Sequence, residues 1–225
     1  MAAFSAAPRI GDLEAVFHMY SYLKWHQRSR LVFDSAYNKE IKIREKPDWS
    51  PFYGDLQEED PPGMPKPRGK PVQQFTYEDS DHAGDTVTRR SRTGVLMFVN
   101  RAPIAWYSKK QLSVETSTFS SEFMALKTAI ELSIGLRYKL KMMGVPLDGP
   151  IVILADNQSV VVNASHPPSV LKKKSVSIAY HFCREHAARG TVQVCFVRSE
   201  ENLADMLTKT QPGPKRQSLV KHVLQ

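Results

Sequence analysis

The chain has 225 residues, of which 41% are hydrophobic and 24% charged, and its 31 basic against 23 acidic side chains give a formal net charge of +8. These values exclude a collagen, a disulfide scaffold and a chain that is disordered throughout. No apolar run approaches the ~18–20 residues of a membrane span, and the opening segment is too polar for a secretory signal. We therefore expect an intracellular protein of the cytoplasm or nucleus, in which Cys183 and Cys195 are free thiols.

The first part of the chain predicts little regular structure beyond one helix. Apolar residues recur at helical spacing over residues 8–27, with Asp12 as the expected N-cap, and a short strand is expected over residues 30–34. Seven of the fifteen prolines follow between residues 47 and 71. Because proline interrupts helices and central strands, this segment is predicted to be an extended linker.

The rest of the chain alternates between strand and helix patterns. Five segments have the pattern of strands: residues 75–79, 94–99, 104–108, 151–155 and 191–197. Four segments have the pattern of helices: residues 119–143 before Gly144, 157–163, 175–189 and 202–209. The order β-β-β-α-β-α-α-β-α predicts an α/β fold with a mixed five-stranded sheet flanked by helices. We expect an α/β domain over residues 74–211, after an N-terminal region (1–46) and a Pro-rich linker (47–73), with a C-terminal tail (212–225) that is helical in part.

Four acidic residues stand where this order of elements would bring them together. Asp79 ends the first strand, Asp156 directly follows the apolar run 151–155, and Glu122 lies in the first turns of the long helix. Asp205 lies in the last predicted helix. A carboxylate directly after a buried strand is costly unless it is solvated, hydrogen-bonded or metal-bound. Each acid also has a simpler explanation, as a turn residue, a helix cap, a solvated helix position or a surface charge.

Converging carboxylates repel one another and raise one another's pKa, and hard divalent cations relieve that repulsion. Two such ions ~3.5–4 Å apart hold both the attacking and the leaving oxygen of a phosphodiester. A nuclease of this kind needs several acids and no nucleophilic side chain. The spacing of the acids alone does not separate this hypothesis from the simpler explanations.

The sequence around the acids carries a further signal. Six motifs follow one another: YEDSDHAGD (77–85) with RRSRTG (89–94), WYSKKQ (106–111), SSEFMAL (120–126), ADNQS (155–159), YHFCRE (180–185) and LADMLTK (203–209). In this order they resemble the ribonuclease H domain of copia-type retrotransposon polyproteins. Residues 7–24 are similar to the end of the reverse transcriptase that precedes this domain, so residues 1–46 would be a remnant of its C-terminal region.

The resemblance implies a ribonuclease H-like fold and metal-dependent endonucleolytic hydrolysis of RNA in RNA–DNA hybrids. By matching position, the catalytic and metal-binding acids would be Asp79, Glu122, Asp156 and Asp205, holding two Mg²⁺ ions for which Mn²⁺ can substitute. Asp79 matches the family's catalytic position better than Asp81. No Tyr-x-Asp-Asp polymerase signature occurs in the chain, so DNA synthesis by this chain alone is not expected. The expected partners are an RNA–DNA hybrid and the polymerase part of a longer polyprotein, with no membrane.

An RNA–DNA hybrid is a polyanion, so cationic contacts should supply much of the affinity. The basic candidates are Arg89, Arg90, Arg92, Lys109, Lys110, Lys172, Lys173 and Lys174. Asn157 and Gln158 follow Asp156 and could hydrogen-bond sugar or base edges, although Asn157 is also a good helix cap. Of Trp106 and Tyr107 in the third strand, Trp106 is expected to pack in the core.

Two other functions compete with the nuclease hypothesis. A catalytically weak or inactive retroelement fragment would keep the fold and the basic surface and only bind nucleic acid. A transposase or integrase shares the fold class, but its acids have the order Asp, Asp, Glu, whereas this chain has Asp, Glu, Asp, Asp.

Overall fold

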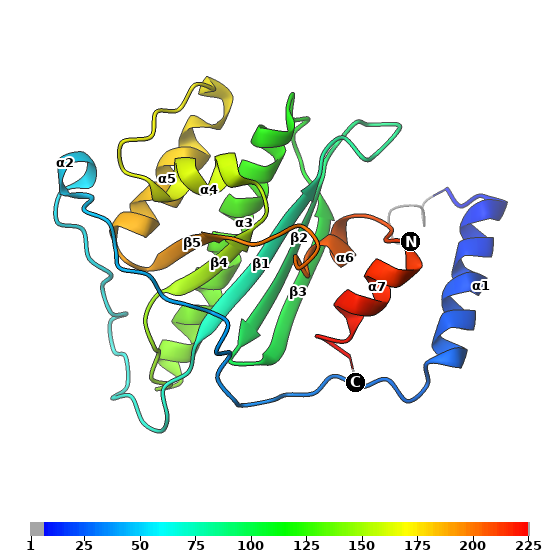
Figure 1. Ribbon diagram of the computed structural model, residues 1–225, viewed down its shortest axis with the longest axis horizontal. Helices are drawn as coiled ribbons and strands as arrows, with labels where there is room; N and C mark the ends of the chain where they lie inside the picture. Colours follow the sequence, from blue (N-terminus) through cyan, green and yellow to red (C-terminus); the bar gives the residue numbers. More distant parts are fainter. Residues whose placement is uncertain (1–6, 225) are drawn as a thin grey trace.

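The computed structural model describes residues 7–224, which form one twisted sheet with helices on both faces (Figure 1). The strands are β1 (Gln74–Asp81), β2 (Arg92–Val99), β3 (Ala102–Lys110), β4 (Ile151–Ala155) and β5 (Val192–Phe196). They lie in the order β3-β2-β1-β4-β5. The β1–β2 and β2–β3 pairs are antiparallel, and the β1–β4 and β4–β5 pairs are parallel. The predicted α/β fold with a mixed five-stranded sheet is confirmed.

The helices lie on the two faces of this sheet, except for the first two, which precede β1 and stand away from it (Figure 1). They are α1 (Ile10–Trp25), α2 (Ser50–Tyr53), α3 (Thr118–Met142), α4 (Gln158–Ser165), α5 (Ser177–Ala188), α6 (Asp205–Thr208) and α7 (Gly213–Val220). Helices α3, α4 and α5 supply the larger hydrophobic core, and α6, α7 and the loop before α6 cover the other face.

Strand β4 shows why the sheet is covered on both sides. All five of its residues are buried. Ile151 and Ile153 point into the core shared with α3, whereas Val152 and Leu154 point into the smaller core on the opposite face. A continuous apolar run is what a parallel strand with two covered faces requires.

Helix α3 is the long helix that the sequence predicted. It begins after Ser117, whose hydroxyl accepts a hydrogen bond from the backbone N–H of Ser120 at 3.2 Å. The helix buries Phe123 and Ile130 completely. Shortly after its end lies Gly144, with a φ of +70°, a left-handed conformation that glycine adopts without steric cost.

The N-terminal helix is present, but its predicted N-cap is wrong. Its N-cap is Arg9, and Asp12 stands at the third helical position, where its carboxylate accepts a bond from the Arg9 N–H at 2.8 Å. None of its sixteen residues is buried, and Phe17 and Trp25 are 60% and 85% exposed. The apolar side chains therefore pack against no core within residues 7–224.

The strand predicted over residues 30–34 is also wrong. Leu31 forms a single isolated bridge with Leu224, beyond the end of α7. One bridge pairs too few backbone groups to extend into a strand. The predicted helix in the C-terminal tail is confirmed as α7, which anchors on the smaller core through the buried Leu219.

The proline-rich segment is largely extended, as predicted, but it is held against the rest of the molecule. Trp49 is 2% exposed and belongs to the larger core. Glu58 accepts hydrogen bonds from Arg137 of α3 at 2.7 Å and forms an ion pair with Lys141 at 2.8 Å. The proline-rich segment therefore packs against the α/β domain. The boundaries between the domains stay a prediction.

Cys183 and Cys195 are both buried and unpaired, which confirms the expectation of free thiols. Within residues 7–224, no helix combines the length and the apolar composition that crossing a bilayer requires.

Candidate active site

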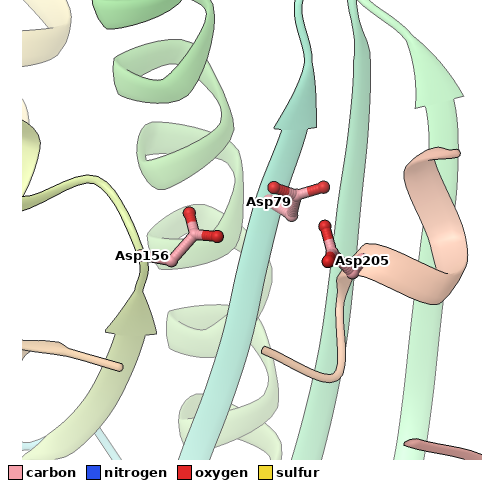
Figure 2. Close-up of side chains that lie close together, drawn as sticks. All are labelled: Asp79, Asp156 and Asp205. Atoms are coloured by element: carbon pink, nitrogen blue, oxygen red, sulfur yellow. The ribbon is translucent and has the colours of Figure 1, made fainter. Parts of the chain in front are cut away.

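Three carboxylates from distant parts of the sequence meet at one end of the sheet (Figure 2). Asp79 lies near the end of β1, Asp156 directly follows β4, and Asp205 is the first residue of α6. One carboxylate oxygen of each lies within 4.8 Å of the corresponding oxygens of the other two.

The register of the sheet explains why Asp79 and Asp156 are neighbours. Strands β1 and β4 run parallel, and Tyr77 pairs with Leu154. Each aspartate stands two residues beyond this pair, so both project from the same end of adjacent strands. This is the edge at which α/β proteins usually place their sites.

Asp205 reaches the cluster from α6, and two lysines neutralise it. The carboxylate is 1% exposed, and its Oδ1 lies 2.6 Å from Lys209 Nζ. Its Oδ2 is paired with the ammonium group of Lys215 on α7. Burial raises the pKa of Asp205, but the bonds from Lys209 and Lys215 outweigh that effect and lower the pKa overall.

Asp79 is 2% exposed, and it has two partners, a hydroxyl group that donates a hydrogen bond and a lysine ammonium group. Thr208 Oγ1, at the end of α6, donates to Asp79 Oδ2, and Lys209 Nζ lies 3.7 Å from the same oxygen. Burial nevertheless raises the pKa of Asp79 to about 6, with the charges of Asp205 and Asp156 adding to the effect.

Glu122 lies beside the cluster in the second turn of α3. Its side chain is 6% exposed, and it is not among the three acids that meet within 4.8 Å. Burial, followed by the charges of Asp79 and Asp156, raises the pKa of Glu122 to about 9. The carboxylate of Asp81 points away from the cluster and toward Gly84. A Cβ atom added to Gly84 would lie 1.7 Å from Asp81 Oδ2.

The structure also reveals an acid that the sequence analysis did not single out. Glu78 is 1% exposed, and neither carboxylate oxygen has a hydrogen-bond partner within the described part of the chain. Burial, and then the charges of Glu122, Asp79 and Asp156, raise the pKa of Glu78 well above its usual value. The sequence did contain a signal for the burial of Glu78, namely its position next to Asp79 inside a predicted strand. Because helices cover both faces of the sheet, a residue on a central strand has no solvent-exposed side.

These shifts predict that the metal-free protein becomes less stable as the pH rises. Glu122 has a pKa near 4.5 when unfolded and about 9 when folded, so the folded state retains a proton that the unfolded chain has lost. The stability that this proton confers is complete below pH ~4.5 and declines as the pH rises toward ~9. In EDTA, Glu122→Gln should reduce the loss of unfolding free energy between pH 5 and pH 8 by at least about 1.4 kcal/mol, the value of one pKa unit. Urea unfolding at the two pH values measures this, and an unchanged loss would contradict it.

The basic candidates lie at the same end of the sheet as the acids. In the register of the sheet, Asp81 pairs with Arg92, which pairs with Lys110. Lys110 forms an ion pair with Asp85, and Lys173 donates to the hydroxyl of Ser117 at the start of α3. The more exposed candidates are Arg89, Arg90, Lys109, Lys172 and Lys174.

The polar candidates Asn157 and Gln158 lie at the start of α4, and the aromatic candidates Trp106 and Tyr107 lie on β3. Asn157 caps α4, where its Oδ1 accepts from the Val160 N–H at 3.2 Å, and Gln158 is exposed. The expectation that Trp106 packs in the core is wrong, since it is 59% exposed and Tyr107 packs on the larger core instead. The alternation along β3 places the two rings on opposite faces, and only the face of Tyr107 is covered at that level.

The fold and the site define a class of protein. A mixed sheet in the order β3-β2-β1-β4-β5, with acids brought together from β1, from the end of β4 and from the C-terminal α6, makes this a ribonuclease H-like α/β protein.

The chain is similar to retrovirus-related Pol polyproteins of plant transposons, which confirms the resemblance inferred from its motifs. It is 32% identical over 143 residues to the polyprotein from transposon RE2 of Arabidopsis thaliana. That alignment covers 63% of this chain and 10% of the relative. It is 32% identical over 139 residues to that from transposon TNT 1-94 of Nicotiana tabacum, covering 62% and 10%. The chain thus spans about a tenth of the length of these curated relatives.

Among solved structures, the N-terminal RNase H domain of a Mycobacterium tuberculosis protein, fused to maltose-binding protein, aligns with a TM-score of 0.48 and 14% identity. The alignment covers 67% of this chain and 97% of that one. No protein-family model matches the chain.

Proposed function

We propose that this chain is the ribonuclease H part of a retrotransposon polyprotein and hydrolyses the RNA strand of RNA–DNA hybrids. The observation that carries the proposal is the meeting of Asp79, Asp156 and Asp205 within 4.8 Å of one another. Glu122 completes the set as a buried acid next to them. The relatives support the polyprotein context, because they are named as Pol polyproteins.

The chemistry of the donors fits a hard divalent cation. All three clustered side chains offer carboxylate oxygens, which Mg²⁺ and Mn²⁺ prefer over sulfur ligands. Asp79, Asp156 and Asp205 would hold the metal, with Glu122 as a fourth ligand. When bound, two such ions supply Lewis-acid stabilisation of the attacking and leaving oxygens of a phosphodiester.

The protein's own cations have a second task at the site. Lys209 Nζ lies 2.6 Å from Asp205 and 3.7 Å from Asp79, and its side chain is 43% exposed. It therefore places a positive charge where the acids open to solvent, which favours the approach of a backbone phosphate. The basic residues on the β1–β2 loop and before α5 extend this positive region, and they would make hybrid binding depend on salt.

The test is cleavage of a short hybrid whose RNA strand is labelled. In the presence of Mg²⁺ we expect labelled RNA fragments from the hybrid, and we expect no cleavage of duplex DNA or duplex RNA. Excess EDTA should abolish the cleavage, and added Mn²⁺ should restore it.

The alternative function is a catalytically inactive fragment that only binds nucleic acid. It is favoured by the pairing of both Asp205 oxygens with lysines, which leaves this carboxylate charge-balanced without a metal. Salt-dependent hybrid binding without cleavage, at any Mg²⁺ or Mn²⁺ concentration, would support this alternative and contradict the nuclease proposal.

A further inference from the structure

Helix α6 carries Asp205 but is too short to fix its own position. It has four residues, whereas isolated helices need roughly 12–15 residues to be even marginally stable. The position of the Asp205 carboxylate relative to Asp79 must therefore be set by contacts between this segment and the sheet.

The sheet makes room for α6 at one position. A Cβ on Gly94 of β2, which pairs with Asp79, would stand 2.9 Å from the carbonyl oxygen of Ala204 and 2.7 Å from Thr208 Cγ2. The missing side chain lets the α6 backbone lie directly on the strand. On the next strand, the Ser108 hydroxyl donates to the carbonyl of Leu207 at 2.6 Å.

One side chain ties the segment before Asp205 to the strand that carries Asp79. Asn202 is 0% exposed. Its Nδ2 donates to the carbonyl oxygen of Glu78 at 2.9 Å, and its Oδ1 accepts from the backbone N–H of Ala204 at 3.1 Å. The same amide group thus bonds the residue immediately before each of the two aspartates.

We infer that Asn202 is a positioning residue that sets the separation of Asp205 and Asp79 and thereby the affinity of the acidic cluster for a divalent cation. This inference rests on the proposed function, since it concerns the metal that the nuclease would use. Asn202 is buried, and its side-chain hydrogen bonds go to Glu78 and Ala204, the residues directly before the two aspartates. Groups that orient metal ligands typically change metal affinity or activity by about 10- to 100-fold when they are removed.

The chain contains a matched control for this experiment. Asn100, at the β2–β3 turn, is 6% exposed and also bridges two backbone groups. Its Nδ2 donates to the Ser35 carbonyl at 2.9 Å, and its Oδ1 accepts from the Gln73 N–H at 2.9 Å. It lies at the opposite end of β1 from the acids, since Gln74 pairs with Val99.

The experiment is calorimetric titration of the whole chain with Mn²⁺, together with hybrid cleavage under saturating metal. For Asn202→Ala we expect Mn²⁺ binding about 10- to 100-fold weaker and a lower kcat, with an unchanged KM for the hybrid. Asn100→Ala should lose stability but bind Mn²⁺ like the wild type. If Asn202→Ala does not fold, Asn202→Ser serves instead, because a serine hydroxyl can still accept from Ala204 but is too short to reach Glu78.

The outcomes separate this inference from the proposed function. Wild-type Mn²⁺ affinity in a folded Asn202 variant, or an equal loss in Asn100→Ala, would overturn the positioning role while leaving the nuclease proposal intact. A wild-type chain that binds Mn²⁺ but cleaves no hybrid would overturn the nuclease proposal alone. A wild-type chain that neither binds Mn²⁺ nor cleaves would overturn both.

Discussion

The Asp156→Asn variant is expected to cleave an RNA–DNA hybrid at least about a hundredfold more slowly than the wild type, the scale of loss when one group that stabilises charge in a transition state is removed. An amide keeps the size of the carboxylate but gives up the negative charge that a divalent cation requires. Single-turnover cleavage with saturating enzyme measures the chemical step without product release.

The same substitution should not destabilise the metal-free fold. The charge of Asp156 raises the pKa of both Asp79 and Glu122, so it opposes ionisation of the buried cluster. Removing this charge relieves a repulsion, and urea unfolding in EDTA should show an equal or higher free energy of unfolding. Loss of activity together with retained stability would mark Asp156 as a residue kept for function.

The matched control is Asp81→Asn. Asp81 lies two residues after Asp79 on the same strand, but its carboxylate lies against Gly84 and outside the cluster. We expect this variant to keep activity within a factor of about ten, well short of the hundredfold effect of a direct charge deletion. Equal inactivation of the two variants, or an active Asp156→Asn, would contradict the assignment of the acids.

The second large effect is on stability and concerns Arg184 in the motif YHFCRE. The guanidinium is 2% exposed, and Nη2 donates to the carbonyl of Pro167 at 2.6 Å. Nη1 lies 3.0 Å from the carbonyl oxygens of both Asn163 and His166. The guanidinium carbon Cζ also lies 4.8 Å from the centre of the Trp49 ring. One side chain on α5 thus joins α4 and the loop after it to the proline-rich segment.

Arg184→Met is expected to lower the free energy of unfolding by about 3 kcal/mol or more, because it leaves several partly buried carbonyls unpaired at a cost of ~1–3 kcal/mol each. Loss of the contact with Trp49 should also loosen residues 47–57 and make them more sensitive to limited proteolysis. Urea unfolding and a proteolysis time course measure the two effects.

Arg189→Ala, at the C-cap of the same helix, is the control. Arg189 pairs with Glu185 at 2.7 Å in an i,i+4 arrangement, and its side chain is 32% exposed. Such pairs contribute only about 0.3–0.5 kcal/mol. If Arg184→Met costs no more than this control, the role of Arg184 as the tie between the three segments is wrong.

The local elements of this protein are encoded locally. The apolar run Ile151–Ala155 predicted β4 with its observed bounds, and the spacing of apolar residues predicted α3 and α5. These predictions succeed because strand and helix periodicities depend on neighbouring residues only. The motifs around Asp79, Asp156 and Asp205 likewise named the acids that meet in the structure.

Other features depended on which faces the tertiary structure covers. Alternation along β3 puts Trp106 and Tyr107 on opposite faces, but only the packed structure shows that Trp106 is the exposed one. In the same way, α1 has a helical pattern of apolar residues and yet buries none of them. A periodic pattern tells which side chains share a face, and it does not tell whether another element lies on that face.

The sequence by itself thus determined the order of the elements, the α/β class and the identity of the clustered acids. Only the tertiary structure decided that Lys215 of α7 pairs with Asp205, that Glu78 is buried without a hydrogen-bond partner among residues 7–224, and that Asn202 ties the segment before α6 to β1. Each of these features depends on residues that are far apart in the chain or lie on different elements. Their existence depends on how the sheet order and the helices pack together, which no local pattern records.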